Sequence, residues 1–233
     1  MAKGAACFDF HVHTMYSPDS ILQPEKIIKI ATKIGLSGVA VTDHNTIKGA
    51  LKTKALVKER KLNFKVIIGS EIKTNYGDII GLFLNDEITS NNFIEVYDKI
   101  REQDGIVVLP HPYKRNINPN KLLKYVDLIE VLNARIPKKL NHKAQKLAKE
   151  TKTKPIAGSD AHMGFEIGYA QTILETYASA SDDDIRKCLL KGYAKIVGSE
   201  LPFHLRMLSV GVGKYKKEGL IGLIKAGCKK VLR

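Results

Sequence analysis

The sequence predicts an α/β fold whose parallel strands close into a TIM-like barrel. Short apolar segments alternate along the chain with amphipathic segments of helical spacing. Strands that alternate with helices form right-handed βαβ units and therefore a parallel sheet, which an open doubly wound fold would also contain. The barrel is favoured because His, Asp and Glu residues follow strand after strand, and a barrel brings all of these carboxyl ends to one face.

The predicted strands are short and rich in Val and Ile, as expected for a sheet that helices cover. They cover residues 7–14, 38–42, 66–68, 78–84, 106–109, 127–133, 155–157, 171–174 and 194–197. The predicted helices carry their apolar residues on one side. They cover residues 24–34, 47–60, 92–103 and 137–150, and a further helix begins at the acidic run 181–184.

The composition of the 233-residue chain is that of a globular protein, with 44% hydrophobic and 27% charged residues. The chain has no apolar run of transmembrane length, and its first residues lack a signal-peptide pattern, so we expect a cytoplasmic protein with no transmembrane segment. Cys7, Cys188 and Cys228 lie far apart, which indicates reduced thiols and excludes a zinc finger. The sequence leaves the oligomeric state open.

The formal net charge of +14 favours an anionic partner, such as a phosphate, a nucleic acid or an acidic membrane surface. A solvated surface coated with lysine would produce the same net charge. The charge therefore does not identify the partner without further evidence.

The first predicted strand carries polar residues where a core strand would have Val or Ile. In a regular strand, alternation places Asp9, His11 and His13 on one face and the intervening apolar residues on the other. Burying such groups without partners costs about 2–7 kcal/mol for a neutral polar group and more for a charge. A metal ion would satisfy them, whereas a half-exposed strand with a polar outer face would need none.

Other residues of the metal-ligating types stand at or near strand ends. The whole set of candidates is Asp9, His11, His13, Asp19, His44, Glu71, Asp78, His111, Asp160 and His162. They are too many for one ion and suit two or three divalent ions of zinc, manganese or iron, with a carboxylate such as Glu71 as a bridge. Neighbouring ions about 3.5–4 Å apart suit phosphoryl transfer. No Gly-rich phosphate loop follows a predicted strand, which disfavours a nucleotide-cofactor fold.

Five motifs in this order give the chain a resemblance to the PHP (polymerase and histidinol phosphatase) superfamily of metal-dependent phosphoesterases. They are Asp9–Thr14, Thr42–His44, Gly69–Glu71, His111–Pro112 and Gly158–His162. The resemblance covers residues 7 to about 198 and implies a distorted (β/α)7 barrel with a trinuclear metal centre. It also implies residues 1–200 as the barrel domain.

The resemblance implies a ligand set for each ion. His11, His13, Glu71 and Asp160 would hold the first ion. Glu71, His111 and Asp78 would hold the second, and Asp19, His44 and His162 the third. Asp9 and Asp43 would support catalysis by orienting the imidazoles.

Asp78 departs from the family pattern, because many members have His at this position. An anionic, harder ligand leaves the identity and occupancy of the second metal open and favours manganese or iron. Alternatively, Asp78 only caps the turn at Tyr76 and Gly77.

Several cations and polar residues lie near the predicted pocket. Glu130, Asn133 and Arg135 match a family segment beside it, where Glu130 and Arg135 would serve catalysis and Asn133 and Arg135 would bind substrate. Arg135 could grip a phosphate with its forked guanidinium. Lys114 and Arg115 could do the same, or they could be solvated loop cations.

Residues 201–233 form a basic, amphipathic C-terminal extension. We expect an added helical segment that packs on or beside the barrel with its basic side in water. A role at a membrane surface or on nucleic acid is the alternative.

Three functions compete. The first is a phosphoesterase that hydrolyses a small phosphate ester, such as a nucleotide or another phosphomonoester, with a metal-activated hydroxide. The second is a nuclease or exonuclease on single-stranded nucleic acid, for which the sequence offers only 7% aromatic residues and no Trp as stacking platforms. The third is a metal-free, non-catalytic subunit of an RNA-processing particle, which the near-complete ligand set disfavours.

Overall fold

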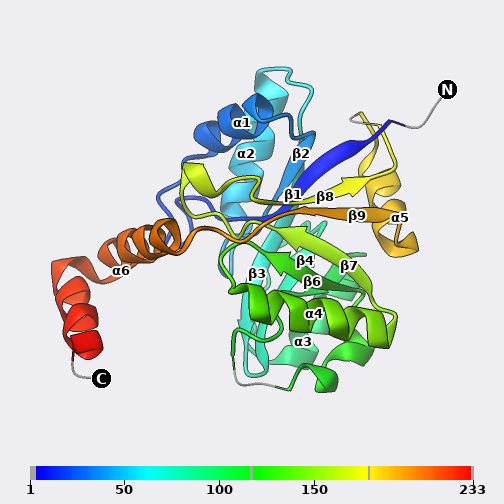
Figure 1. The fold of residues 1–233 in the computed structure, drawn as a ribbon. Helices are drawn as coiled ribbons and strands as arrows, with labels where there is room; N and C mark the ends of the chain where they lie inside the picture. Colours follow the sequence, from blue (N-terminus) through cyan, green and yellow to red (C-terminus); the bar gives the residue numbers. More distant parts are fainter. Residues whose placement is uncertain (1–3, 116–117, 178, 232–233) are drawn as a thin grey trace.

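A computed structural model describes residues 4–115, 118–177 and 179–231 of the chain, with side chains as far as residue 220. Nine strands form one sheet that curls into a nearly closed barrel, with helices on its outside (Figure 1). The strands are β1 (Ala6–Val12), β2 (Gly38–Val41), β3 (Lys65–Thr74), β4 (Gly77–Leu82), β5 (Ile106–Leu109), β6 (Leu128–Asn133), β7 (Lys154–Gly158), β8 (Ala170–Leu174) and β9 (Ala194–Gly198).

The helices follow the sequence pattern closely. They are α1 (Pro24–Lys33), α2 (Lys48–Glu59), α3 (Phe93–Glu102), α4 (Lys138–Thr151), α5 (Asp182–Lys191) and α6 (Phe203–Val231), with short 3-10 turns η1 (Pro119–Lys121), η2 (Leu123–Tyr125) and η3 (Gly164–Glu166). Local chemistry explains two of the starts, because Pro24 opens α1 and the Ser181 side chain caps α5.

The strand order is β7-β6-β5-β4-β3-β2-β1-β8-β9, which confirms the TIM-like barrel. The expectation that all strands run parallel fails for two of them. β4 is antiparallel to β3 and β5, and β8 is antiparallel to β1 and β9. Only residues 75–76 join β3 to β4, and so short a connection allows a hairpin but no crossover helix. The amino end of β4 therefore lies at the same rim as the carboxyl ends of its neighbours.

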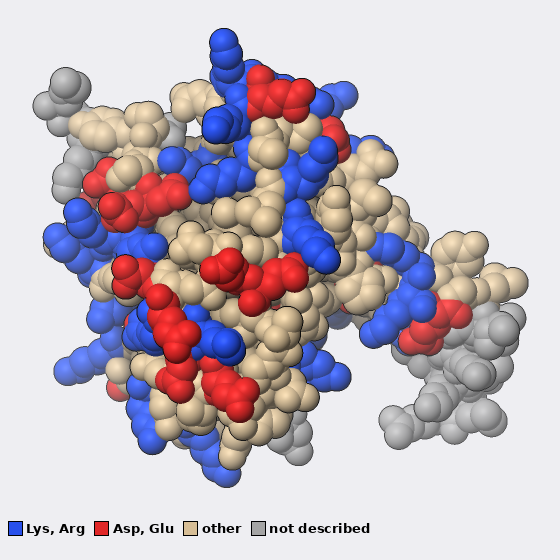
Figure 2. All heavy atoms as spheres, turned by 180° about the vertical axis from the view of Figure 1, so that it is seen from behind, with Lys and Arg blue, Asp and Glu red and all other residues tan. Residues whose placement is uncertain are grey.

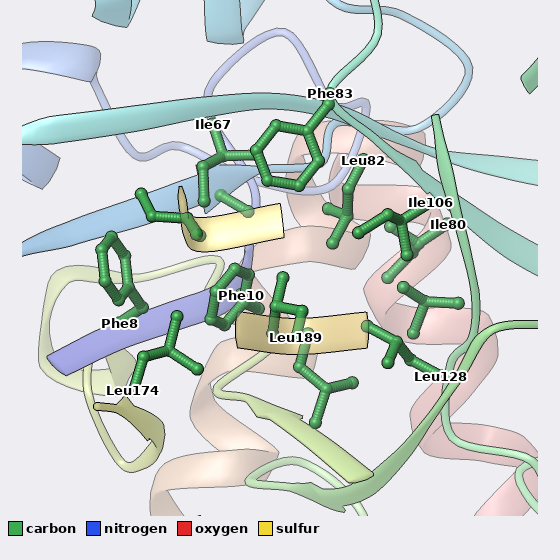
Figure 3. Close-up of a cluster of buried hydrophobic side chains, with 14 of the residues drawn as sticks. Phe8, Phe10, Ile67, Ile80, Leu82, Phe83, Ile106, Leu128, Leu174 and Leu189 are labelled. Atoms are coloured by element: carbon green, nitrogen blue, oxygen red, sulfur yellow. The ribbon is translucent and has the colours of Figure 1, made fainter. Parts of the chain in front are cut away.

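The amino-terminal half of the barrel is filled by apolar side chains (Figure 3). Phe8, Ile67 and Ile106 point inward from three strands, and Leu189 of α5 joins the same cluster. Helix α5 therefore closes the amino end, which leaves the carboxyl end as the open face for a site.

The barrel closes at its carboxyl rim, where the chain after β7 meets β1. The His13 amide donates to the Ala161 carbonyl at 2.8 Å, and the Ala161 amide donates to the His11 carbonyl at 3.3 Å. Gly158 permits this approach, because a Cβ there would lie 2.2 Å from the His11 Cβ.

Helix α6 leaves the barrel beside this rim (Figure 1). Its helical geometry is interrupted at Gly219, where φ is 65° and ψ is −164°. The structure describes no side chain beyond residue 220, so the apolar and basic side chains expected from residue 221 onward, and Cys228, lie outside the described part. Cys7 and Cys188 are free thiols. Among the described residues, no helix is both long and apolar enough to cross a membrane.

We predict that Gly158→Ala lowers the free energy of unfolding by about 2 kcal/mol or more, because the added methyl group forces β7 away from β1. Urea unfolding measures the change through the transition midpoint. Gly4→Ala is the control, since a Cβ there makes only ordinary contacts at 3.7 Å. Equal midpoints for the two variants would contradict close packing at Gly158.

Candidate metal centre

A register shift in β1 decides which of its side chains face the barrel interior. Asp9 pairs with Val39 and Val12 pairs with Val41, so three steps along β1 match two steps along β2. One extra residue therefore lies in β1 at this point, as in a β-bulge. Val12, Val39 and Val41 all pack in the cluster outside the barrel, and paired residues of a parallel ladder point to the same side. Asp9 consequently also faces outward.

The shift brings both histidines of β1 inward without Asp9. Phe10 points into the barrel, and His11 and His13 follow it above the apolar core. The expectation that Asp9 shares a face with the two histidines is therefore wrong, because it assumed an unbroken period of two along the strand.

The first predicted ligand set converges on one point. The Nε2 atoms of His11 and His13 lie 3.0 Å apart, and each lies 3.4 Å from Oε2 of Glu71. Oδ1 of Asp160 lies 3.7 Å from the first and 3.3 Å from the second. Ligand atoms about 2.1 Å from a tetrahedral ion would be about 3.4 Å apart, so this set has the spacing that a metal requires.

Hydrogen bonds at Nδ1 fix the orientation of the His11 and His13 rings. His11 Nδ1 lies 2.8 Å from Glu130 Oε1, and His13 Nδ1 lies 3.0 Å from Ser17 Oγ, which itself donates to Asp43 at 2.7 Å. Both rings therefore donate through Nδ1 and direct their Nε2 atoms toward each other.

Four atoms of the types that bind metals consequently face one another across the first set. Glu71 Oε2 is buried and has no hydrogen-bond partner among the described residues. Positive charge must lie among these atoms, as protons or as a metal ion. The donor set of two imidazoles and two carboxylates suits zinc, manganese or iron, so the residues fit the expected group.

The second predicted set meets the other oxygen of Glu71. His111 Nε2 lies 2.8 Å from Glu71 Oε1. A carboxylate oxygen of Asp78 lies within 4.8 Å of a ligand atom of each of these two residues. Asp78 stands in the antiparallel β4, whose amino end the hairpin brings to this rim. It also pairs with Arg115 at 2.9 Å, so the guanidinium contacts a candidate ligand.

The third predicted set lies at the mouth of the site. Asp19 Oδ1 is 3.3 Å from His162 Nε2 and 3.6 Å from His44 Nε2, and it has no hydrogen-bond partner among the described residues. The side chains of Asp19 and His44 are 33% and 27% exposed, whereas those of the first set are nearly inaccessible. A substrate therefore has access from this side.

Burial and neighbouring charge determine the ionisation of the metal-free centre. Burial alone would raise the pKa of Glu71, but the imidazoles of His11, His111 and His13 hold this pKa well below its usual range. Burial likewise opposes a low pKa at Asp160, where the charges of His11 and Lys114 outweigh it. Both groups are therefore carboxylates at neutral pH, which is the form that binds cations.

The described geometry gives Asp9 and Asp43 other partners than those expected. Asp9 accepts hydrogen bonds from the amides of Ser159 and Gly168 at 2.8 and 2.9 Å, and burial raises its pKa to about 6. It touches no imidazole and instead ties β1 to the loop after β7. Asp43 reaches His13 only through Ser17.

Glu130 and Asn133 are positioned behind the ligand atoms. Glu130 receives a hydrogen bond from the His111 amide at 2.8 Å as well as from His11. Asn133 is fully buried, and its amide nitrogen is 3.0 Å from Glu130 and 3.2 Å from Asp160. This placement differs from the expected substrate contact of Asn133, because its donors are already engaged with carboxylates.

The basic residues surround the centre at different depths. Arg135 contacts His162 and lies 3.8 Å from Asp160, with 15% of its side chain exposed. Lys114 lies 3.8 Å from Asp160 and 3.5 Å from His111, with 43% exposed. Arg115 is engaged with Asp78 and is not free to meet a substrate in this arrangement.

Strained backbone marks three strand ends at the rim. Asn45, His111 and Asp160 follow β2, β5 and β7 and have φ values of 56°, 28° and 56°. Such left-handed conformations cost residues other than glycine about 1–3 kcal/mol each. Two of the three are candidate ligands, so backbone strain accompanies their placement.

Two further groups, which the sequence did not indicate, position the candidate ligands. Ser17 lies in a loop after β1, where no periodicity signals its contacts with His13 and the His44 amide. Glu166 accepts hydrogen bonds from the amides of His162 and Met163 at 2.6 and 2.8 Å, from a 3-10 turn that the sequence does not predict. Both depend on contacts between distant loops.

The chain is similar to known proteins. The profile of the PHP domain family matches residues 9–199. Two uncharacterised proteins of Methanocaldococcus jannaschii are related. One is 47% identical over 45% of this chain and 67% of its own length, and the other is 33% identical over 83% of this chain and 81% of its own.

Solved structures share the fold at low sequence identity. A two-domain protein from Bacteroides vulgatus, containing a predicted PHP-like metal-dependent phosphoesterase, matches 89% of this chain and 69% of its own with a TM-score of 0.71 and 19% identity. A lesion-specific endonuclease from Pyrococcus furiosus matches 83% of this chain and 58% of its own with a TM-score of 0.63 and 16% identity.

We predict that Ser17→Ala weakens metal binding about 10- to 100-fold, because His13 loses the partner that keeps its Nε2 free. Calorimetric titration of the metal-free protein with Mn²⁺ or Zn²⁺ measures the affinity. Thr14→Val is the matched control, since the Thr14 hydroxyl also donates to Asp43, at 2.6 Å, but contacts no imidazole. Equal losses in the two variants would assign the effect to Asp43 and not to the His13 contact.

Proposed function

This chain belongs to the PHP domain family, and we propose that it is a hydrolase that cleaves a small phosphate ester with the help of two or three divalent ions of zinc, manganese or iron. The convergence of the imidazoles of His11, His13 and His111 on the two oxygens of Glu71 is the observation that carries the proposal.

In this proposal three sets of side chains would hold the ions, and Glu71 would belong to two of them. His11, His13, Glu71 and Asp160 hold the first, at the bottom of the site. Glu71, His111 and Asp78 hold the second, and Asp19, His44 and His162 hold the third, at the mouth. When bound, such ions polarise phosphate oxygens and activate water for attack on phosphorus.

The remaining polar residues have supporting roles. Glu130 and Ser17 keep the rings of His11 and His13 in the orientation that presents Nε2. Lys114 and Arg135 meet the phosphate from the solvent side, where their positive charge counters the charge that develops as the ester bond breaks. Lys114 remains cationic, because Asp160 and Glu71 raise its pKa although burial opposes this.

The dimensions of the site support a small substrate. The first ligand set is buried, whereas Asp19 and His44 at the mouth are partly exposed. On the face shown in Figure 2, lysine and arginine side chains are interspersed with acidic ones, and the basic groups do not form an unbroken track. One phosphate can meet Lys114 and Arg135 beside Asp160 without a long basic groove.

A nuclease is the second candidate. The net charge of +14 suits a polyanion, and a lesion-specific endonuclease has the same fold. Its substrate would extend from the mouth of the site across surface lysines. A metal-free RNA-processing subunit has less support, because such a protein would have no need for so many inward-facing acceptors.

We predict that the chain purified without chelator contains at least two equivalents of metal and that Glu71→Gln reduces this by about two. Asp19→Asn should lose about one, because Asp19 belongs to a single set whereas Glu71 is shared. Elemental analysis measures the content. Less than one equivalent in the parent protein, with no uptake of added manganese or zinc, would refute the metal centre.

We also predict faster turnover on a mononucleotide or another small phosphomonoester than on an oligonucleotide, with a Michaelis constant that changes little with salt. Each backbone phosphate neutralised in a long contact would add roughly 0.7 to the salt slope of a single strand. Assays at low and moderate salt compare the substrates. A steep salt dependence with preference for long strands would support the nuclease instead.

Lys114→Met should raise the Michaelis constant for a phosphomonoester about 10- to 100-fold, because a charge-assisted hydrogen bond to the phosphate is lost. Lys146→Met is the control, since this side chain is 76% exposed and lies on α4 away from the site. Similar kinetics in both variants would remove Lys114 from the substrate site.

A further inference from the structure

A lysine ammonium of helix α6 contacts the loop after β1, beside the site. Nζ of Lys216 donates hydrogen bonds to the carbonyl oxygens of Met15, Ser17 and Ser20, at 2.7, 2.7 and 2.6 Å. A lysine ammonium has three donors, and here all of them are used on one loop. The loop after β1 is therefore wrapped around a cation that comes from the far end of the chain.

The same loop contains two groups of the candidate centre. Ser17 is the partner of His13, and Asp19 places Oδ1 between His44 and His162. Ser20 anchors the other side of the loop by donating to the carbonyls of His13 and His162. The carbonyl oxygens on the outer side of the loop receive their hydrogen bonds from Lys216 of α6.

A second contact lies one turn earlier in α6. Gly213 is buried against the loop, and a Cβ at this position would lie 2.7 Å from the Asp19 carbonyl oxygen and 3.3 Å from its Cβ. A glycine therefore allows the helix backbone to lie directly on the residue that carries the third set. Gly211, in the same helix, has nothing within 4 Å of an added Cβ.

We propose that Gly213 and Lys216 are positioning residues for the outermost metal ion, so that the C-terminal helix completes a site otherwise built from the barrel. The proposal rests on the metal centre of the proposed function. It assigns α6 to the third set, since the first set stands on strands or directly after them and is held from behind by Glu130 and by the Ser17 hydroxyl, which Asp43 fixes independently of α6.

The direction in which the metal affinity changes in a Lys216 variant shows whether Lys216 acts by holding the loop or only through its charge. Removing a positive charge near a cation site should strengthen cation binding, because the repulsion between the two is reduced. If Lys216 acts by holding the loop, Lys216→Met weakens binding of the third ion in spite of its lost charge. Lys217→Met removes the same charge from the next residue, for which no hydrogen bond or ion pair is recorded with the described side chains.

The first experiment titrates the metal-free full-length protein and four variants with Mn²⁺ and follows free Mn²⁺ by electron paramagnetic resonance. We expect Gly213→Ala and Lys216→Met to weaken the weakest of three binding steps about ten-fold or more, with the two tighter steps unchanged. Gly211→Ala and Lys217→Met should bind three ions as the parent does. Both glycine variants gain the same helix propensity, so this difference cancels.

The second experiment measures amide hydrogen exchange of residues 15–22 in the metal-free protein, where no ion holds the loop. Exchange there should accelerate in Lys216→Met and not in Lys217→Met. Unchanged exchange, or equal effects in each variant and its control, would overturn the proposal. A parent that binds no ion would refute the proposed function as well, whereas a parent that binds two ions and shows no third step would refute the positioning role alone.

Discussion

The buried carboxylate of Glu71 is the group on which the rest of the site depends. One oxygen meets His111, and the other faces His11 and His13 without a hydrogen-bond partner among the described residues. An anion with almost no exposure is tolerated only if positive charge surrounds it. The imidazoles must therefore converge on β3 from β1 and from the loop after β5.

The convergence of these side chains requires departures from regular strand geometry. β1 contains an extra residue between Asp9 and Val12, and β6 has a corresponding shift between Glu130 and Leu132. Each shift changes the face to which the following side chains point, and each occurs at the rim. His111 and Asp160 add left-handed backbone conformations. The apolar core in the amino-terminal half of the barrel, closed by α5, stabilises the fold and so compensates for this strain (Figure 3).

The outer edge of the site is held differently from its base. Ligands at the bottom stand on strands or follow them directly, whereas Asp19 stands in a loop between β1 and α1. Loops lack the ladder hydrogen bonds of a sheet, so a loop ligand needs anchors of its own. Ser20 supplies one on the barrel side, and Gly213 and Lys216 of α6 contact the other. The tail that follows the family-matched region is thus in contact with the mouth of the site.

The sequence by itself determined the order of strands and helices, the barrel and the identity of the candidate ligands. These features follow from local periodicity and from the types of residue at strand ends, both of which are properties of neighbouring positions in the chain. Only the tertiary structure decided that Asp9 faces outward, that β4 runs antiparallel and brings Asp78 to the rim, and that Asn133 is buried between carboxylates. It also decided the partners Ser17 and Lys216, because a hydrogen bond between loops or helices far apart in the chain depends on the closed barrel and has no local pattern to reveal it.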